Sequence, residues 1–456
     1  MRRKIMDELI RWKESGDHGC LLVGGARQVG KTYIIEEFGR TYRHCCRFDL
    51  SSDIAARSAF KDNRSVDEII MGLSLIDPDA EFVPGETLIF LDEIQDCPEA
   101  RSALKPLAID GRYDVVASGS LLGLRLKDVK AYPVGYQDRL YLNPMDFEEF
   151  LWALNVKQDV IDYVRRCIRA REPIMEPVFE TMSKYMRWYM VTGGMPQAVK
   201  TFVSQRKMDD VRRVQSRIVE DYMDDITRYA DLNERIRVEG CFRSVSSQLA
   251  DDNRRFTYSA IEGNPGRGAD RYTYSVDWLL NAGIAVRCNN VRNPESPVEA
   301  QAIDNVFKLY MRDTGLLISR YDPLIGAGII NGEYGINKGA IVENAVADML
   351  AYQNRPLLYL RRDRDADGRT DRMEVDFLLE TSEGVAAVEV KSGAKRSSHS
   401  LHKAMDRYGL VGIMFETRNI FVDDTGVRHY PLFAAAFMDE IDPRPEVAFD
   451  LGGAGV

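Results

Sequence analysis

A glycine-rich loop near the start of the chain has residue types and a spacing that suit the binding of a phosphate chain. Residues 25–32 read GARQVGKT and match the pattern G-x-x-x-x-G-K-[ST]. Glycines let consecutive backbone N–H groups turn toward one centre and donate to phosphate oxygens. Lys31 is then placed for the β- and γ-phosphates, and the Thr32 hydroxyl for Mg²⁺. The predicted binding residues are Gly25, Ala26, Arg27, Gln28, Val29, Gly30, Lys31 and Thr32.

Two acids follow an apolar run at 88–93, which reads LIFLDE. Such a run predicts a buried strand that ends at the carboxyl edge of a sheet, where ligands bind. Asp92 would complete the Mg²⁺ shell, and Glu93 would orient and polarise an attacking water, a role that a kinase does not need. The pair therefore predicts hydrolysis of a nucleoside triphosphate. The alternative interpretation is a solvated strand end.

Ser118 lies near the end of another apolar run, VVASGS at 115–120. In a catalytic role its hydroxyl would bind the γ-phosphate or the attacking water; the alternative is a plain Ser/Gly turn. An arginine that reaches the nucleotide from elsewhere in the chain cannot be chosen from the sequence. Arg112, Arg139 and Arg228 are weak candidates, and none is preferred.

A second set of acids, with a lysine, lies in the last third of the chain. Glu389 and Lys391 share one face of a predicted strand, and Asp376 lies on the preceding arm of the same hairpin. Glu343 would come from a helix packed nearby. A metal-dependent phosphodiesterase needs carboxylates to hold Mg²⁺ and a lysine to steady charge near the attacked phosphate. The alternative is a nuclease-shaped fold that is inactive or only binds.

Short apolar runs alternate with longer amphipathic stretches over residues 20–150 and would position the loop and the acid pair. Such runs are typical of strands buried on both faces of a parallel sheet and joined by crossover helices. We therefore expect an α/β layered domain in the first third of the chain. The predicted strands are at 20–23, 45–50, 87–94, 113–120 and 139–142, with a helix at 33–38.

The pattern changes twice in the rest of the chain. Residues 146–230 have apolar residues near the helical period, with a break at TGGMPQAV, 192–199. Residues 235–290 predict short helices followed by a strand that begins in IAVRC, which is the order of a winged-helix unit. From about residue 300 strands and helices alternate, and MEVDFLLE and VAAVEVKS flank a TSEG turn as a hairpin.

Composition places the chain among soluble globular proteins. It has 456 residues, too many for a single hydrophobic core, of which 45% are apolar and 29% charged. No apolar run is long enough for a membrane span, and the seven dispersed cysteines are typical of a reducing cytoplasm. A net charge of −10 argues against a uniformly basic nucleic-acid binder but leaves room for a local basic face. We expect a cytoplasmic protein without membrane contact.

With these motifs the sequence resembles a prokaryotic family of AAA+-type P-loop ATP-binding proteins with a C-terminal domain of unknown function that has a restriction-endonuclease-like core. The resemblance covers nearly the whole chain. One departure is Tyr136, which follows the Gly of the PVG segment where many relatives have Arg or Lys. The stretches that carry the resemblance are GGARQVGKT, TLIFLDEIQ, VVASGSLLG, PVGYQDRLYLNPMDFEEFL, YMVTGGMPQAV, DYMDDITRYAD, WLLNAGIAVRC, FKLYMRDTGLL, KGAIVENAVADML and MEVDFLL…VEVKSG.

The resemblance implies ATP binding and Mg²⁺-dependent hydrolysis of the AAA+ class, with DNA or another nucleic acid and further copies of the chain as candidate partners. The alternatives are an ATP-gated DNA-binding protein or nuclease that uses Asp376, Glu389 and Lys391, and a slow nucleotide-dependent regulator. The implied fold is α/β. The predicted domains are an AAA+-like P-loop ATPase domain (1–150), a helical segment (151–232), a winged-helix-like module (233–298) and a restriction-endonuclease-like domain with a loose tail (299–456).

Overall fold

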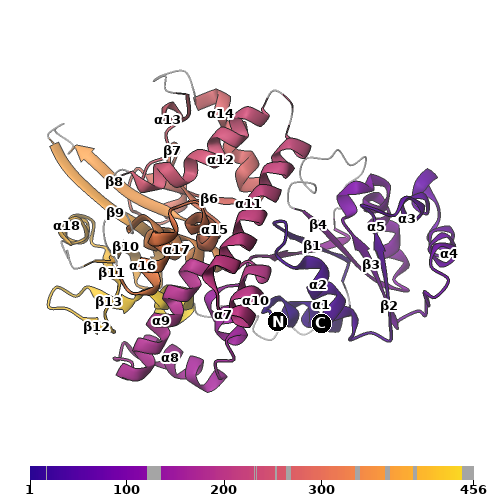
Figure 1. Cartoon of the computed structure of the whole chain (residues 1–456), viewed down its shortest axis with the longest axis horizontal. Helices are drawn as coiled ribbons and strands as arrows, with labels where there is room; N and C mark the ends of the chain where they lie inside the picture. The colour runs from indigo at the N-terminus through magenta and orange to yellow at the C-terminus, as the bar shows by residue number, and fades with distance from the viewer. Residues whose placement is uncertain are drawn as a thin grey trace, which may run out of the picture.

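The computed structural model of the chain describes residues 1–16, 18–120, 135–230, 232, 234–251, 254–262, 269–333, 339–364, 370–393 and 398–443. They form an N-terminal α/β body and a larger body that contains most of the helices and a second sheet (Figure 1). The long helix α11 (Met208–Tyr229) runs between the two bodies. None of the described helices is long and apolar enough to cross a bilayer.

The N-terminal body is built on a sheet of five parallel strands in the order β2-β3-β4-β1-β5. Every residue of β1 and β3 is buried, as expected for central strands of a parallel sheet. All five predicted strands are confirmed. They are β1 (Cys20–Gly25), β2 (His44–Asp49), β3 (Thr87–Asp92), β4 (Asp114–Ser120) and β5 (Gln137–Leu142).

Helices cover both faces of this sheet, because successive strand residues point to opposite sides. Leu21 and Leu88 pack on the side of α1 and α2, whereas Leu22 and Ile89 pack on the side of α4 and α5. The carboxyl edge of the strands is left for the loops that carry the predicted site. The helices are α1 (Ile5–Ser15), α2 (Lys31–Gly39), α3 (Ile54–Ser58), α4 (Val66–Ile76) and α5 (Pro98–Asp110).

The stretch predicted to be helical at 146–230 folds into five helices within the described residues. They are α7 (Phe147–Ala153), α8 (Gln158–Ala170), α9 (Glu176–Thr192), α10 (Pro196–Gln205) and α11. The TGGMPQAV break separates α9 from α10. Gly194 accepts a hydrogen bond from Met145 N at 2.7 Å and donates to Asp313 Oδ2 at 2.6 Å. A Cβ on Gly194 would lie 2.0 Å from the Met145 carbonyl oxygen, so only glycine lets these three segments meet.

A second sheet of eight strands forms the larger body, in the order β12-β13-β11-β10-β9-β8-β6-β7. The predicted hairpin is confirmed, since Gly384 pairs with Thr381 and Val388 with Phe377 in antiparallel register. The strands are β6 (Ala285–Val291), β7 (Ala302–Met311), β8 (Leu358–Arg364), β9 (Thr370–Thr381), β10 (Gly384–Val390), β11 (Val411–Glu416), β12 (Phe421–Val422) and β13 (Arg428–Pro431).

The predicted order of short helices followed by a strand is present at 235–291, but the strand, β6, belongs to this larger sheet. β6 pairs antiparallel with β7 and parallel with β8, so hydrogen bonds cross the predicted boundary at 298. The winged-helix identity stays a prediction, and residues 444–456, in the predicted loose tail, lie outside the described residues. The helices are α12 (Arg235–Ala250), α13 (Ser259–Glu262), α14 (Ala269–Asn281), α15 (Thr314–Ser319), α16 (Pro323–Ile330), α17 (Gly339–Tyr352), α18 (His399–Tyr408) and α19 (Met438–Ile441).

Candidate nucleotide site

The loop at 25–32 joins the carboxyl end of β1 to α2. Because α2 begins at Lys31, the positive end of this helix and its free N–H groups face the loop. Gly30 has φ +93° and Gln28 φ +64°, so the backbone turns through left-handed conformations at two positions. The strand–loop–helix context that the sequence pattern requires is confirmed.

Lys31 is folded back onto its own loop. Its side chain is 6% exposed, and Nζ donates to the carbonyl oxygens of Gly25 at 3.1 Å and Ala26 at 2.9 Å. Burial lowers the pKa of its ammonium, and the charges of Glu93 and Asp92 act in the opposite direction. A phosphate oxygen at the loop would therefore offer this ammonium a charged acceptor in place of two neutral carbonyls.

Asp92 lies at the end of β3 and is engaged on both of its oxygens. Thr32 Oγ1 donates to Oδ2 at 3.0 Å, and Arg47 Nη2 donates to the same oxygen at 2.8 Å. The buried Ser118 hydroxyl donates to Oδ1. A hydroxyl beside a carboxylate is an oxygen ligand set that Mg²⁺ accepts, so Thr32 and Asp92 fit the predicted metal role. The sequence did not point to Arg47.

Glu93 follows with a left-handed backbone, φ +54° and ψ +48°. Its N–H donates to Ser118 Oγ at 3.3 Å, and its carboxylate accepts from the Gln95 side-chain amide. Ser118 therefore contacts both residues of the acid pair and holds β3 to β4 at this edge. The structure gives Ser118 a positioning contact, and its predicted role as a catalytic sensor stays a prediction.

Helix α11 contacts the loop directly through two acids that the sequence did not single out as functional. Asp225 accepts from the Arg27 guanidinium, and Asp221 accepts from the Gln28 amide. Burial raises the pKa of Asp225 to about 6, while Arg27 and Arg228 oppose the shift. The available signal was the i, i+4 spacing of the two acids in DYMDDITRYAD, which places them on one helix face.

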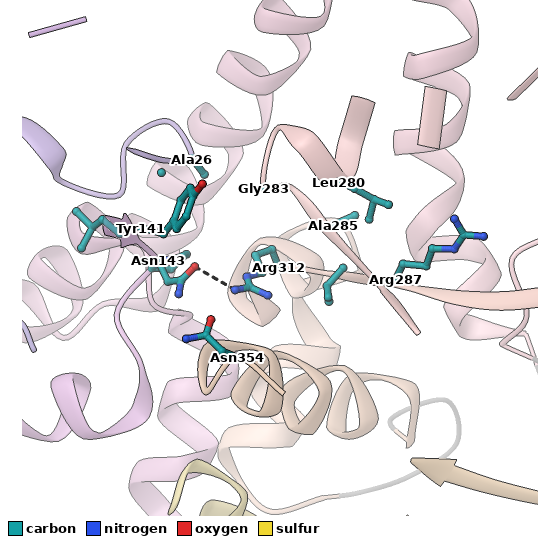
Figure 2. A pocket seen from close by; sticks show the side chains of 13 residues that line it. Ala26, Tyr141, Asn143, Leu280, Gly283, Ala285, Arg287, Arg312 and Asn354 are labelled. Atoms are coloured by element: carbon teal, nitrogen blue, oxygen red, sulfur yellow. Dashed lines mark hydrogen bonds between the residues drawn. The ribbon is translucent and has the colours of Figure 1, made fainter. Parts of the chain in front are cut away.

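A cavity of about 370 Å³ lies between the loop and the larger body (Figure 2). On one side it is lined by Gly25, Ala26 and residues 141–144, and on the other by the turn between α14 and β6, by Arg312 and by Asn354. Arg312 Nη2 donates across the cavity to Asn143 Oδ1 at 3.0 Å. The aromatic ring of Tyr141 lies beside Ala26 in this view.

Arg228 and Arg112, two of the three weak arginine candidates, form ion pairs. Arg228 on α11 lies 3.9 Å from Asp96 Oδ2, close to the acid pair. Arg112 forms surface ion pairs with Asp110 and Asp67. A nucleotide role stays unassigned for all three.

The residues predicted for a second site do come together at the second sheet. Asp376 accepts a hydrogen bond from Val390 N at 2.8 Å, and Lys391 donates to Glu389. Glu343 on α17 and Asp376 both lie beside the ammonium of Lys308. Burial, reinforced by the charge of Asp376, raises the pKa of Glu389 to about 7. Lys308, which sequence reasoning missed, lies at 1% exposure among these acids.

Comparison with protein families matches the N-terminal body to a known domain. Residues 17–151 match an AAA domain model, which confirms the predicted AAA-type ATPase part of the chain. Residues 183–322 and 338–432 match two further models, both of domains of unknown function (DUF8612 and DUF4143). The restriction-endonuclease-like core stays a prediction. No curated protein matches the chain.

Comparison with solved structures finds several chains of low sequence identity. A Walker-type ATPase of Pyrococcus abyssi is 13% identical, with 70% of this chain and 95% of that chain covered and a TM-score of 0.43. A RuvB variant of Thermotoga maritima is 12% identical, with 63% and 89% covered and a TM-score of 0.28. AMPPCP-bound DnaA from Aquifex aeolicus is 13% identical, with 60% and 86% covered and a TM-score of 0.27.

Proposed function

We propose that the chain is a Mg²⁺-dependent ATPase of the AAA class that binds ATP at residues 25–32. The observation that supports this most strongly is the loop itself, which lies at the carboxyl end of β1 inside a domain that matches an AAA model. The acid pair at the end of β3 supplies the residues that hydrolysis needs.

In the proposed mechanism the backbone N–H groups of the loop and Lys31 bind the triphosphate. Thr32 and Asp92 would hold Mg²⁺, whose charge would neutralise the phosphate oxygens. Glu93 orients the attacking water and accepts its proton, while Ser118 keeps the acid pair in place. The phosphates compete with Asp225 for Arg27 and with Asp221 for Gln28. These two side chains therefore leave α11 only where the phosphates bind them more strongly.

We further propose that the nucleoside of ATP enters the cavity next to the loop. Phosphates bound at Gly25 and Ala26 would place the ribose and base toward β5, where Tyr141 and Arg312 line the space. Tyr141 is 53% exposed, so its ring is available for a base to stack on.

Tyr141→Ala is expected to weaken ATP binding about tenfold, because loss of base stacking costs on the order of 1–3 kcal/mol. Affinity for inorganic tripolyphosphate, which has no base, should be unchanged. Tyr141→Phe is the control that keeps the ring and should bind ATP like the wild type. Calorimetric titrations measure all three proteins; an equal loss for ATP and tripolyphosphate would contradict a nucleoside site here.

Coupling to nucleic acid is the second candidate function. A hollow on α18 is lined by His399, His402, Lys403, Asp406 and Arg407, and its basic side chains favour contact with phosphates. Lys403 and Arg407 also pair with Asp371, which reduces the net charge they present.

A labelled DNA duplex titrated at two salt concentrations tests this coupling. We expect affinity to fall steeply with salt, because phosphate contacts release counterions. The double substitution Lys403→Ala/Arg407→Ala should weaken binding, and Lys200→Ala on the exposed side of α10 should not. If the duplex does not bind at low salt, the proposed coupling to nucleic acid is rejected. A steady-state ATPase assay with and without the duplex then shows whether turnover responds.

A further inference from the structure

Lys308 lies in β7 within a stretch, 307–311, in which every residue is buried. A lysine side chain with 1% exposure is rare, because an ammonium taken out of water must be paired to remain charged. Its surroundings show what it is paired with. The feature does not belong to the nucleotide site and is independent of the proposed ATPase activity.

Three carboxylates surround the ammonium of Lys308. Nζ lies 3.0 Å from Glu343 Oε1, 3.0 Å from Glu374 Oε1 and 4.0 Å from Asp376 Oδ1. Tyr310, two residues along β7 and on the same face, donates its hydroxyl to Glu343. The lysine thus joins α17 to β7 and β9 at one point.

Other cations of the chain complete the charge balance of this cluster. Arg254 pairs with Glu343, Arg361 Nη1 lies 3.3 Å from Glu374 Oε2, and Lys391 pairs with Glu389. The carboxylates of Glu343 and Glu374 are thus paired from two sides, by Lys308 and by an arginine each, whereas Glu389 Oε2 is buried without a hydrogen-bond partner among the described residues.

The cluster does not fit the divalent cation that a metal-dependent phosphodiesterase would use. Mg²⁺ requires oxygen ligands arranged around one centre with room for its waters. Here the centre shared by three carboxylates is the lysine Nζ. Within the described part of the chain, no three or more Asp, Glu, His or Cys residues are grouped so as to hold a metal ion.

We infer that Lys308 is a built-in cation that occupies the position of a metal ion among Glu343, Glu374 and Asp376, so that this acid cluster assembles without a divalent cation. In the larger body these acids, which resemble those of a phosphodiesterase site, then have a structural role. Any contact that it makes with nucleic acid is binding without Mg²⁺-dependent cleavage at these residues.

The test is a Mn²⁺ titration of the full chain without nucleotide, in which the EPR signal of free Mn²⁺ is measured at each step. The wild type should show no Mn²⁺ site that depends on Asp376. Lys308→Met, whose side chain is one atom shorter and leaves the Nζ position vacant, should gain a bound Mn²⁺ that is lost again in Lys308→Met/Asp376→Asn. Lys308→Arg, which keeps a cation, should gain none. Asp92→Asn identifies any Mn²⁺ that is held at the nucleotide site, by Asp92 and Glu93.

Two results would overturn the inference. One is a Mn²⁺ ion bound by the wild type and lost in Asp376→Asn. The other is a folded Lys308→Met protein that binds no additional Mn²⁺. If Lys308→Met does not fold, the wild-type and Asp376→Asn titrations decide alone: the first result overturns the inference, and its absence supports it.

Discussion

Lys31→Ala is expected to abolish measurable ATP binding. The Lys31 ammonium lies among the carbonyls of the loop and would pair with a bound phosphate. Removing one partner of such a desolvated charge pair costs about 2–5 kcal/mol, or about thirtyfold or more in affinity. Titration with a fluorescent ATP analogue measures the loss. Turnover should fall with binding, because no substrate is then held.

Lys105→Ala is the matched control for this substitution. Lys105 is exposed on α5 of the same domain, and its removal should leave ATP affinity unchanged. Thermal unfolding of both variants without nucleotide separates a binding defect from a folding defect. Equal ATP affinity for the wild type and Lys31→Ala would count decisively against the assignment of the loop.

Glu93→Gln is expected to keep ATP binding and lose turnover. A positioned general base contributes about 10²–10⁴-fold in rate, and an amide cannot accept the proton of the attacking water. The substituted side chain is of equal size, and the N–H of residue 93 still donates to Ser118. Phosphate release under saturating ATP measures the rate, and the same fluorescent titration measures binding.

Glu99→Gln removes the same charge six residues further along, at an exposed position in the first turn of α5. It should turn over ATP like the wild type. If Glu93→Gln hydrolyses ATP at the wild-type rate, Glu93 is not the base. If instead it loses binding together with turnover, Glu93 contributes to holding the nucleotide.

The N-terminal sheet was predictable because its signals are local. Each of the five apolar runs became a strand, and the loop between β1 and α2 followed from eight consecutive residues. The acid pair followed from the same logic, since a strand end in a parallel sheet fixes where Asp92 and Glu93 emerge.

Contacts between distant segments could not be predicted in this way. Asp221 and Asp225 meet the loop only because α11 crosses it, and no local pattern encodes that crossing. The parallel pairing of β6 with β8 joins segments that are far apart along the chain, so helix and strand order alone pointed to a separate module.

Lys308 shows the same limit within the second site. The acids and Lys391 were visible as a short motif, whereas Lys308 is a single charge inside the apolar stretch FKLYM. The one local signal was that Lys308 and Tyr310 share a strand face. That this face meets Glu343 depends on the packing of α17 against β7.

A structure of the chain with a non-hydrolysable ATP analogue and Mg²⁺ tests the central claim most directly. We predict phosphate density within hydrogen-bond distance of the main-chain N–H groups of residues 28–32, with Lys31 Nζ turned from Gly25 and Ala26 toward it and Mg²⁺ next to Thr32 and Asp92. Nucleotide bound elsewhere, with this loop unchanged at a saturating concentration, would contradict the account.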